Sequence, residues 1–417
     1  MTIPEPITWL SNPRAATIAH SPAVAKYFPK GIAETTRAFH SQIPGYHISP
    51  LKSLNRLAGL IGVEKIWVKD EADRLNLGSF KVLGGSYAIY QTIVKKLGYP
   101  KGFTFADLKK PEIREKLGDV TFAAATDGNH GRGVAWAATQ LGFKSIIYVH
   151  KHTSEARIKA IAQNGAEVKV IDGTYDDAVR QVNVDANNNG WQVISDTAWE
   201  GYEEIPVWVM QGYTTLYSEV QQQLVAMGEF APTHIFMQAG VGSLAASAFG
   251  YYASLFAPQR PKMVVVEPDR AACLFHSMEI GDGEPHSFPG DLDTIMAGLA
   301  CGDPNPIAWE VIKDCADGFI KCPDYVAAKG MRVGGVPLNG DPYIIAGESG
   351  AVSLGALMFV MELDRYKPVR EALGLDRHSR VLLVNSERNT DPDDYRRVVW
   401  DGGDQIPKEY RVYENPF

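Results

Sequence analysis

The sequence predicts an α/β fold made of two doubly wound parallel-sheet lobes with a cleft between them. Its 417 residues suit about two domains of the usual ~100–200 residues each. Short apolar segments alternate with amphipathic ones, which is typical of parallel strands joined by helices. The alternation occurs in two series, so we expect a large lobe of residues 1–87 and 205–417 and a small lobe of residues 88–204.

The first series lies between residues 120 and 196. Four apolar segments predict its strands, in chain order VTFAAAT, SIIYVH, EVKVID and WQVISD. The amphipathic stretches between them predict three helices. Ser154 is suited to cap the second helix, and Gly142 and Gly165 provide stop signals.

The second series follows a long helix that we expect over about residues 202–228. Its strands are predicted at HIFMQAG, KMVVVEP and RVLLVNSE, and a helix is expected from about Gly242. The loop-rich segment from Met278 to Asp293 predicts an excursion on the surface.

Composition and charge narrow the classes of function. Forty-one Lys and Arg against 49 Asp and Glu give a net charge of −8 without a basic run, which argues against nucleic-acid and anionic-membrane partners. No apolar run reaches the ~18 residues of a transmembrane helix, and no signal peptide is apparent, so we expect a cytoplasmic protein. None of the four cysteines belongs to a C-x-x-C pair, so no metal site is expected. Free thiols are favoured, and a bridge between Cys273 and Cys301 stays open.

Lys81 lies in the stretch LNLGSFKVLGGSYAIY, where apolar spacing predicts that a helix begins. The helix dipole and the N–H groups of a first turn disfavour a positive charge there, which favours the uncharged amine that a Schiff-base lysine needs. Gly84 and Gly85 would let a bulky ring approach the backbone. The alternative is a solvated lysine at a helix start.

Two glycine-containing turns each follow a predicted strand and precede a helix, ATDGNHGRGVA and QAGVGSLAAS. Their backbone N–H groups suit a carboxylate or a phosphate. Asp127 is unexpected in the first turn unless it has a cationic partner or a proton to transfer; otherwise it caps the helix, and His130 packs in the turn. The second turn is not a Walker loop, because no Gly-Lys-Ser/Thr follows; close helix packing or half of a dinucleotide fingerprint would also explain it.

Two further segments carry polar groups at predicted strand ends. SDTAWEGYEEIP contains Asp196, Glu200, Glu203 and Glu204, which predict either a site for cationic substrates or a solvated acidic helix start. Ser386 lies at the C-terminal edge of a parallel strand, where ligands are bound in this architecture. A hydroxyl there is suited to hold a ring nitrogen.

Taken together, these stretches resemble the fold-type II enzymes that use pyridoxal 5′-phosphate (PLP), the superfamily of tryptophan synthase β and threonine dehydratase. GSFKVLGG resembles the S-F-K-x-R-G lysine motif, DGNHGRG the asparagine loop and GVGSL the phosphate loop. Within the superfamily, TDGNHGRGVAWAA, DTAWEGY, TIMAGLACG and GESGAV resemble the 2,3-diaminopropionate ammonia-lyases. The similarity runs from about Phe39 to Trp400.

The resemblance implies a role for each matching residue. Lys81 would bind PLP covalently, Asn129 would hydrogen-bond its 3-oxygen, and Ser386 would face its pyridine nitrogen. The phosphate would be bound in the large lobe by the backbone amides of Gly240, Val241, Gly242, Ser243 and Leu244. The substrate carboxylate would be held by the turn that comprises Thr126, Asp127, Gly128, Asn129 and His130.

The implied reaction is an elimination that converts D- or L-diaminopropionate to pyruvate and two ammonia. Lys81 would take the Cα proton from one face and Asp127 from the other, while Asp127 and Asp196 would stabilise the β-ammonium group. Two alternatives remain open, namely a lyase of the same fold that acts on serine or threonine, and a non-catalytic PLP-binding protein. A small-molecule amino-acid substrate and a homodimer are expected from the resemblance.

One position departs from the family pattern. Arg388 stands where the family usually has a glycine, after Ser386 and Glu387. If that glycine needs a positive φ or close contact with the cofactor ring, we expect Arg388 to change substrate choice or to impair activity.

Overall fold

The computed structural model describes residues 3–18, 20–98, 103–126, 128–151 and 153–412. The chain forms two compact units. Unit 1 comprises Met1–Lys30, Ser49–Ala72 and Glu219–Phe417, and unit 2 comprises Gly31–Ile48 and Asp73–Ser218. The small lobe expected at residues 88–204 lies within unit 2, which also takes in neighbouring segments on both sides.

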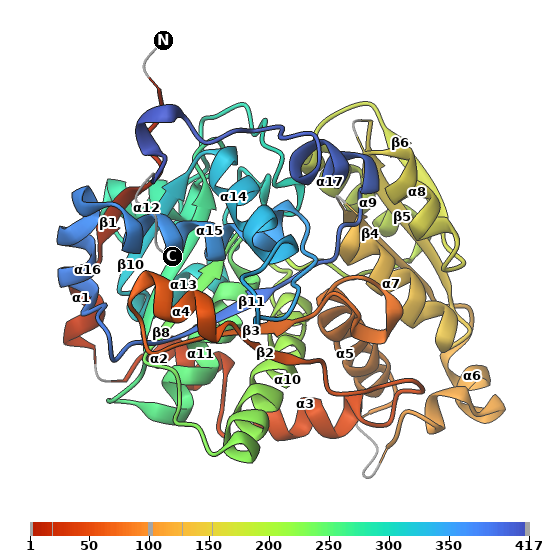
Figure 1. Ribbon diagram of the computed structural model, residues 1–417. Helices are drawn as coiled ribbons and strands as arrows, with labels where there is room; N and C mark the ends of the chain where they lie inside the picture. The colour runs from red at the N-terminus through yellow and green to blue at the C-terminus, as the bar shows by residue number, and fades with distance from the viewer. Residues whose placement is uncertain (1–2, 19, 99–102, 127, 152, 413–417) are drawn as a thin grey trace. The chain divides into compact units, whose positions relative to one another are not determined.

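Unit 1 is built on a seven-stranded sheet in the order β1-β10-β9-β8-β11-β3-β2. The five inner strands are mutually parallel, whereas β1 and β2 pair antiparallel at the two edges. In Figure 1, β11 from near the C-terminus lies beside β3 from near the N-terminus. The strands span β1 (Thr8–Ser11), β2 (Leu51–Ser53), β3 (Lys65–Asp70), β8 (His234–Gln238), β9 (Lys262–Pro268), β10 (Gly318–Cys322) and β11 (Arg380–Asn385).

Helices cover this sheet and bury its inner strands, of which β8 and β9 carry runs of apolar residues through the core. Two of them, α14 and α15, pack so closely that a Cβ at Gly330 would lie 2.1 Å from the Ala351 carbonyl oxygen. The helices are α1 (Pro13–Thr17), α2 (Pro22–Tyr27), α4 (Asn55–Ile61), α11 (Ser243–Phe256), α12 (Cys273–Ile280), α13 (Pro306–Cys315), α14 (Asp324–Gly335), α15 (Glu348–Glu362), α16 (Lys367–Leu373) and α17 (Pro392–Val399). Short 3₁₀ helices in the two units are η1 (Arg74–Asn76), η2 (Asp107–Lys109), η3 (Ala297–Leu299), η4 (Asp364–Tyr366) and η5 (Lys408–Tyr410).

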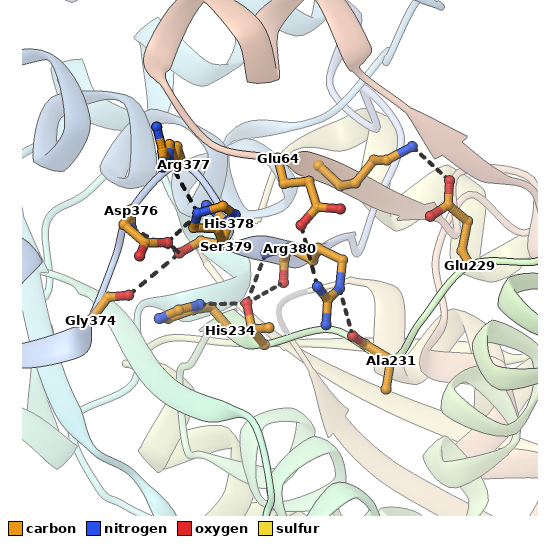
Figure 2. Close-up of polar contacts among 12 residues, drawn as sticks. Glu64, Glu229, Ala231, His234, Gly374, Asp376, Arg377, His378, Ser379 and Arg380 are labelled. Carbon is orange, nitrogen blue, oxygen red and sulfur yellow. Dashed lines mark hydrogen bonds and ion pairs between the residues drawn. The ribbon is translucent and has the colours of Figure 1, made fainter.

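The amino ends of the parallel strands of unit 1 are joined by polar contacts (Figure 2). The Arg380 guanidinium donates to the Ala231 carbonyl at 3.2 Å and lies 3.3 Å from a Glu64 carboxylate oxygen. Lys65 pairs with Glu229 at 2.6 Å. Because these partners satisfy one another, we assign this end of the sheet a structural role, which leaves the carboxyl ends for ligand binding.

Unit 2 contains a four-stranded, fully parallel sheet in the order β6-β5-β4-β7, as the first series predicts. Its strands are β4 (Thr121–Thr126), β5 (Lys144–His150), β6 (Glu167–Ile171) and β7 (Gln192–Val193). Its helices are α3 (Ile32–His40), α5 (Lys81–Lys96), α6 (Pro111–Leu117), α7 (Asn129–Gln140), α8 (Glu155–Ala162) and α9 (Tyr175–Asn189). The predicted cap of α8 is confirmed, because the Ser154 hydroxyl accepts from the Arg157 N–H.

The long helix α10 (Glu204–Met227) begins in unit 2 and continues into unit 1. It confirms the helix predicted at about residues 202–228. Within the described part of the chain, none of the helices combines the length and apolar character that crossing a bilayer requires.

Candidate active site

Lys81 is the first residue of α5, as the sequence predicts. The Ser79 hydroxyl accepts from the Lys81 backbone N–H at 3.2 Å. The Nζ atom of Lys81 lies 2.6 Å from Oδ2 of Asp196, with side-chain exposures of 19% and 6%. The amine is therefore held in a partly buried ion pair, and the carboxylate favours the charged amine that the helix dipole disfavours.

Asp196 lies just after β7 and is the one buried member of the acidic segment. Glu200, Glu203 and Glu204 are exposed. Burial opposes ionisation of Asp196, but the charges on Lys81 and His130 outweigh it and lower the pKa of the Asp196 carboxyl to about 2. The carboxylate is thus fully ionised at neutral pH and already contacts a primary ammonium group.

Three buried polar atoms around this ion pair have no hydrogen-bond partner among the described residues. They are Nδ1 of His130, Oγ1 of Thr197 and Oη of Tyr213. Thr197 is adjacent to Asp196 in the chain, and the charge of His130 acts on Asp196. Unsatisfied buried polar atoms are rare in folded proteins, so their occurrence around one lysine indicates a place for a polar ligand.

The tautomer of His130 is set by its surroundings. Its Nε2 atom lies 2.8 Å from the Ile194 carbonyl oxygen, which can only accept. Nε2 therefore carries a hydrogen, and in the neutral tautomer of the ring Nδ1 presents a lone pair. A carboxylate would be bound at Nδ1 only by the charged imidazolium.

Tyr213 comes from α10 and is 1% exposed. The Phe80 ring packs edge-on against it, with ring centroids 4.7 Å apart. Burial raises the pKa of the Tyr213 phenol far above its ordinary value, and the charges of Lys81 and Asp196 both act on it. The hydroxyl therefore remains protonated and can donate a hydrogen bond.

The glycines after Lys81 serve helix packing. A Cβ at Gly84 would lie 2.5 Å from Cε1 of Tyr213, and one at Gly85 would lie 3.3 Å from Cγ2 of Val134. The expectation that both make room for a ligand ring is therefore wrong for the described structure. The ring that Gly84 accommodates belongs to Tyr213, because α5 and α10 approach closely there.

The first glycine turn is organised by Thr126 at the end of β4. Its Oγ1 accepts from the backbone N–H groups of Gly128 at 2.8 Å and Gly131 at 3.0 Å. Asn129 then begins α7, and Gly128 has a φ of +148°, which favours glycine. Asp127 lies outside the described residues, so its assigned role stays a prediction.

The second glycine turn, Gly240–Leu244, joins β8 to α11. Gly242 has a φ of +100° and caps α11 without any side-chain hydrogen bond. A Cβ at Gly240 would lie 3.1 Å from the Cys301 sulfur and 3.2 Å from the Leu299 Cα. A helix start that depends on glycine backbone and has no side-chain cap suits a phosphate, so this turn fits the expected group.

Ser386 follows β11, beside the β8 strand that leads into the second glycine turn. It is 5% exposed, and its Oγ accepts from Nε2 of Gln238 at 2.9 Å. No acceptor for the Ser386 hydroxyl hydrogen is present among the described residues. A buried donor at a strand's carboxyl end fits the nitrogen of a bound ring.

The remaining sequence questions concern the thiols and Arg388. All four cysteines are free, so the favoured interpretation is confirmed and no Cys273–Cys301 bridge is formed. Arg388 is exposed and is not among the described residues with positive φ. The backbone cost of replacing a glycine there is therefore absent, whereas an effect on the cofactor ring stays a prediction.

Sequence reasoning missed two residues that the structure places at these sites. The sequence places Gln238 at the start of the second glycine turn without indicating a role for it, and none of the motifs contains Tyr213. A buried amide that ends a central strand was a usable signal for Gln238. Tyr213 gave none, because an aromatic residue on a long helix is ordinarily part of the core.

The chain is similar to known proteins in sequence and in structure. A family model described as pyridoxal-phosphate dependent enzyme matches residues 43–385. Diaminopropionate ammonia-lyase of Escherichia coli (strain K12) is 48% identical over 376 residues, which cover 90% of this chain and 93% of that protein. The crystal structure of the selenomethionine-incorporated holo form of the Escherichia coli lyase has a TM-score of 0.88 at 44% identity, covering 96% of this chain and 98% of that one.

A second crystal structure of the Escherichia coli lyase, in complex with an aminoacrylate-PLP azomethine reaction intermediate, has a TM-score of 0.87 at 43% identity. It covers 96% of this chain and 98% of that chain. The predicted α/β fold with parallel sheets, of fold type II, is thereby confirmed.

Proposed function

The chain belongs to the family of pyridoxal-phosphate dependent enzymes, and on this basis we propose that it converts 2,3-diaminopropionate and one water to pyruvate and two ammonia. The β-amino group leaves by elimination, and hydrolysis of the product releases the α-amino group as the second ammonia. The proposal is supported by the 48% identity to the Escherichia coli diaminopropionate ammonia-lyase. The observation that carries it is the partly buried ion pair between Lys81 and the buried carboxylate of Asp196.

The residues that would hold PLP supply complementary groups. When bound, PLP withdraws the electron pair that remains on the substrate Cα after its proton has left. The amides from Gly240 to Leu244 at the start of α11 would bind the phosphate. Ser386 would donate to the pyridine nitrogen, Asn129 would hydrogen-bond the 3-oxygen, and Lys81 would form the covalent attachment.

Asp196 favours a diamino substrate over serine or threonine. The β-amino group must carry a proton in order to leave as ammonia. Because the pKa of Asp196 is lowered to about 2, its carboxylate is charged at neutral pH and can bind and stabilise a β-ammonium group. Serine and threonine carry a neutral hydroxyl in place of the β-ammonium group, so the Asp196 carboxylate stabilises them less than it stabilises diaminopropionate.

Lys81 and Asp127 would divide the removal of the Cα proton between the two faces of the substrate. Lys81 can accept a proton only as an uncharged amine that is no longer attached to PLP and is not paired with Asp196. A substrate ammonium beside Asp196 would take the place that Lys81 occupies in the cofactor-free protein. The turn from Thr126 to His130 would hold the carboxylate of the substrate.

The test compares the release of pyruvate and ammonia from D- and L-diaminopropionate with that from D- and L-serine. We expect diaminopropionate to be the better substrate; faster turnover of serine would favour the dehydratase-like alternative. Borohydride reduction and peptide mapping should place the pyridoxyl label on Lys81, and Lys81→Ala should lose the label and about 10²–10⁴-fold in rate. Cofactor binding without ammonia release would support a non-catalytic PLP-binding protein.

We further propose that the enzyme is a cytoplasmic homodimer, on the resemblance to PLP-dependent lyases. Light scattering should give about twice the chain mass of 45.7 kDa. A monomer mass at micromolar concentration would contradict the dimer. Fractionation of the cells should recover the activity with the cytoplasmic enzymes.

A further inference from the structure

Gln238 is the last residue of strand β8 and is 1% exposed. Its Nε2 donates to the Val384 carbonyl at 2.8 Å and to the Ser386 hydroxyl at 2.9 Å. Its Oε1 accepts from the Ser353 hydroxyl at 3.1 Å. Ser353 lies on α15 and is also 1% exposed, so the whole group is withdrawn from water.

The orientation of the Gln238 amide follows from its neighbours. The Val384 carbonyl can only accept a hydrogen bond, so the NH₂ group must face it. A rotated amide would bring Oε1 against that carbonyl oxygen and would also deprive the Ser353 hydroxyl of its acceptor. The Val384 contact thus selects this orientation, and the Ser353 hydroxyl, which can donate or accept, is compatible with it.

This orientation determines the direction of the next hydrogen bond. Because Nε2 donates to Ser386 Oγ, the single hydroxyl hydrogen of Ser386 points to a different acceptor. No such acceptor is present among the described residues. A ring nitrogen with a lone pair would satisfy this hydrogen, whereas a protonated ring nitrogen would leave it unpaired in a buried place.

We propose that Gln238 is a positioning residue that commits Ser386 to donate, and so keeps the pyridine nitrogen of PLP unprotonated. This inference rests on the proposed function. Gln238 acts through Ser386 and needs no contact with the cofactor. An unprotonated nitrogen moderates the electron withdrawal of the ring, which favours elimination over transamination.

The decisive variant is Gln238→Glu, which keeps the shape of the side chain. In this buried place the new carboxyl is protonated and directs its O–H to the Val384 carbonyl; the same oxygen accepts from Ser386, and the other oxygen still accepts from Ser353. Ser386 then donates to the carboxyl and can accept from the ring nitrogen. The variant therefore reverses the direction of the hydrogen bond without removing it.

The measurement is the nitrogen-15 NMR resonance of enzyme reconstituted with PLP labelled at the pyridine nitrogen. Free labelled PLP in acid and in alkali supplies the two reference positions. We expect the wild type at the unprotonated position and Gln238→Glu shifted toward the protonated one. The matched control, Ser353→Ala, should keep the wild-type resonance, because the Val384 carbonyl still orients the amide.

Dependence on Ser386 is tested with the double variant Ser386→Ala/Gln238→Glu. Its nitrogen-15 resonance should equal that of Ser386→Ala alone. A protonated nitrogen in the wild type, or an unchanged resonance in Gln238→Glu, would overturn the proposal for Gln238 and leave the elimination reaction intact. Failure of the wild type to attach PLP at Lys81 would instead refute the proposed function.

A second variant keeps the proposal testable if Gln238→Glu does not fold. Gln238→Met removes the donor at similar volume, so the Ser386 hydroxyl loses its fixed direction. We expect the affinity of the apoenzyme for PLP, measured by equilibrium dialysis, to fall about tenfold. Unchanged affinity would reject the proposal.

Discussion

Nζ of Lys81 lies 2.6 Å from Oδ2 of Asp196, although 115 residues separate them in the chain. The carboxylate is buried and fully ionised at neutral pH, and it contacts the amine expected to carry the cofactor. A carboxylate that already binds one primary ammonium is suited to bind another, and this relationship supports a diamino substrate.

Asp196→Asn should separate the two candidate substrates. Loss of the charge removes the partner of the β-ammonium group, so kcat/KM for diaminopropionate should fall about 10²-fold. Turnover of serine should change by less than about tenfold, because it loses only a neutral contact. The matched control is Glu200→Gln, which removes an exposed carboxylate from the same segment and should leave both rates unchanged. An equal loss for both substrates would contradict the role of Asp196.

The same carboxyl makes stability depend on pH at the acidic end. Its pKa is lowered from its ordinary value to about 2 in the folded protein, so the unfolded chain takes up the proton first as pH falls. The contribution of Asp196, about 2 kcal/mol, is therefore present above about pH 4 and is lost as pH falls through 2. Urea unfolding of the cofactor-free protein should show a gap between wild type and Asp196→Asn that closes over this range. A constant gap would show that the ion pair does not titrate as described.

Tyr213→Phe should affect catalysis without a cost in stability. The hydroxyl is buried and has no partner among the described residues, so its removal should leave the free energy of unfolding unchanged or slightly higher. If the hydroxyl donates to the bound substrate, kcat/KM should fall about tenfold. In contrast, the hydroxyl of Tyr252 accepts from Gln221 at 3.1 Å, so Tyr252→Phe should lose stability and keep its rate. Full activity of Tyr213→Phe would remove the residue from the site.

Gly242→Ala should weaken both the fold and the attachment of PLP. The φ of +100° is strained for alanine, and the new Cβ would lie 3.0 Å from Cδ1 of Ile312. We expect a loss of about 1–2 kcal/mol in stability together with weaker PLP binding, measured by denaturation and equilibrium dialysis. Gly281→Ala introduces a comparable strain at the end of α12 and should lose stability alone. Equal PLP affinities in the two variants would argue against phosphate binding by the second glycine turn, Gly240–Leu244.

Asp127→Asn should distinguish the two enantiomers of the substrate. If Asp127 removes the proton on one face and Lys81 on the other, this variant should lose mainly the activity with D-diaminopropionate, about 10²–10⁴-fold. Separate assays with the D and L substrates measure the difference. Retained turnover of D-diaminopropionate would reject the proposal that Asp127 and Lys81 remove the Cα proton on opposite faces.

Much of the local structure could be predicted from the sequence. The alternation of apolar and amphipathic segments predicted the strands of unit 2, and the spacing after Lys81 predicted the start of α5. Strands β3 and β10 were missed, because the lysines in KIWVKD and GFIKC interrupt their apolar pattern. The edge strands β1 and β2 were also missed, since each has only three or four residues.

The sequence by itself determined the strands of unit 2 and the start of α5, because periodicity, caps and turn glycines act between residues that are close along the chain. Its motifs also carried the resemblance to the family. Only the tertiary structure decided which side chains meet. It pairs Lys81 with Asp196, packs the ring of Tyr213 against Gly84, and directs the Gln238 amide toward Ser386. These relationships join residues that are distant in sequence and depend on which face each element presents, and neither local propensity nor spacing specifies that.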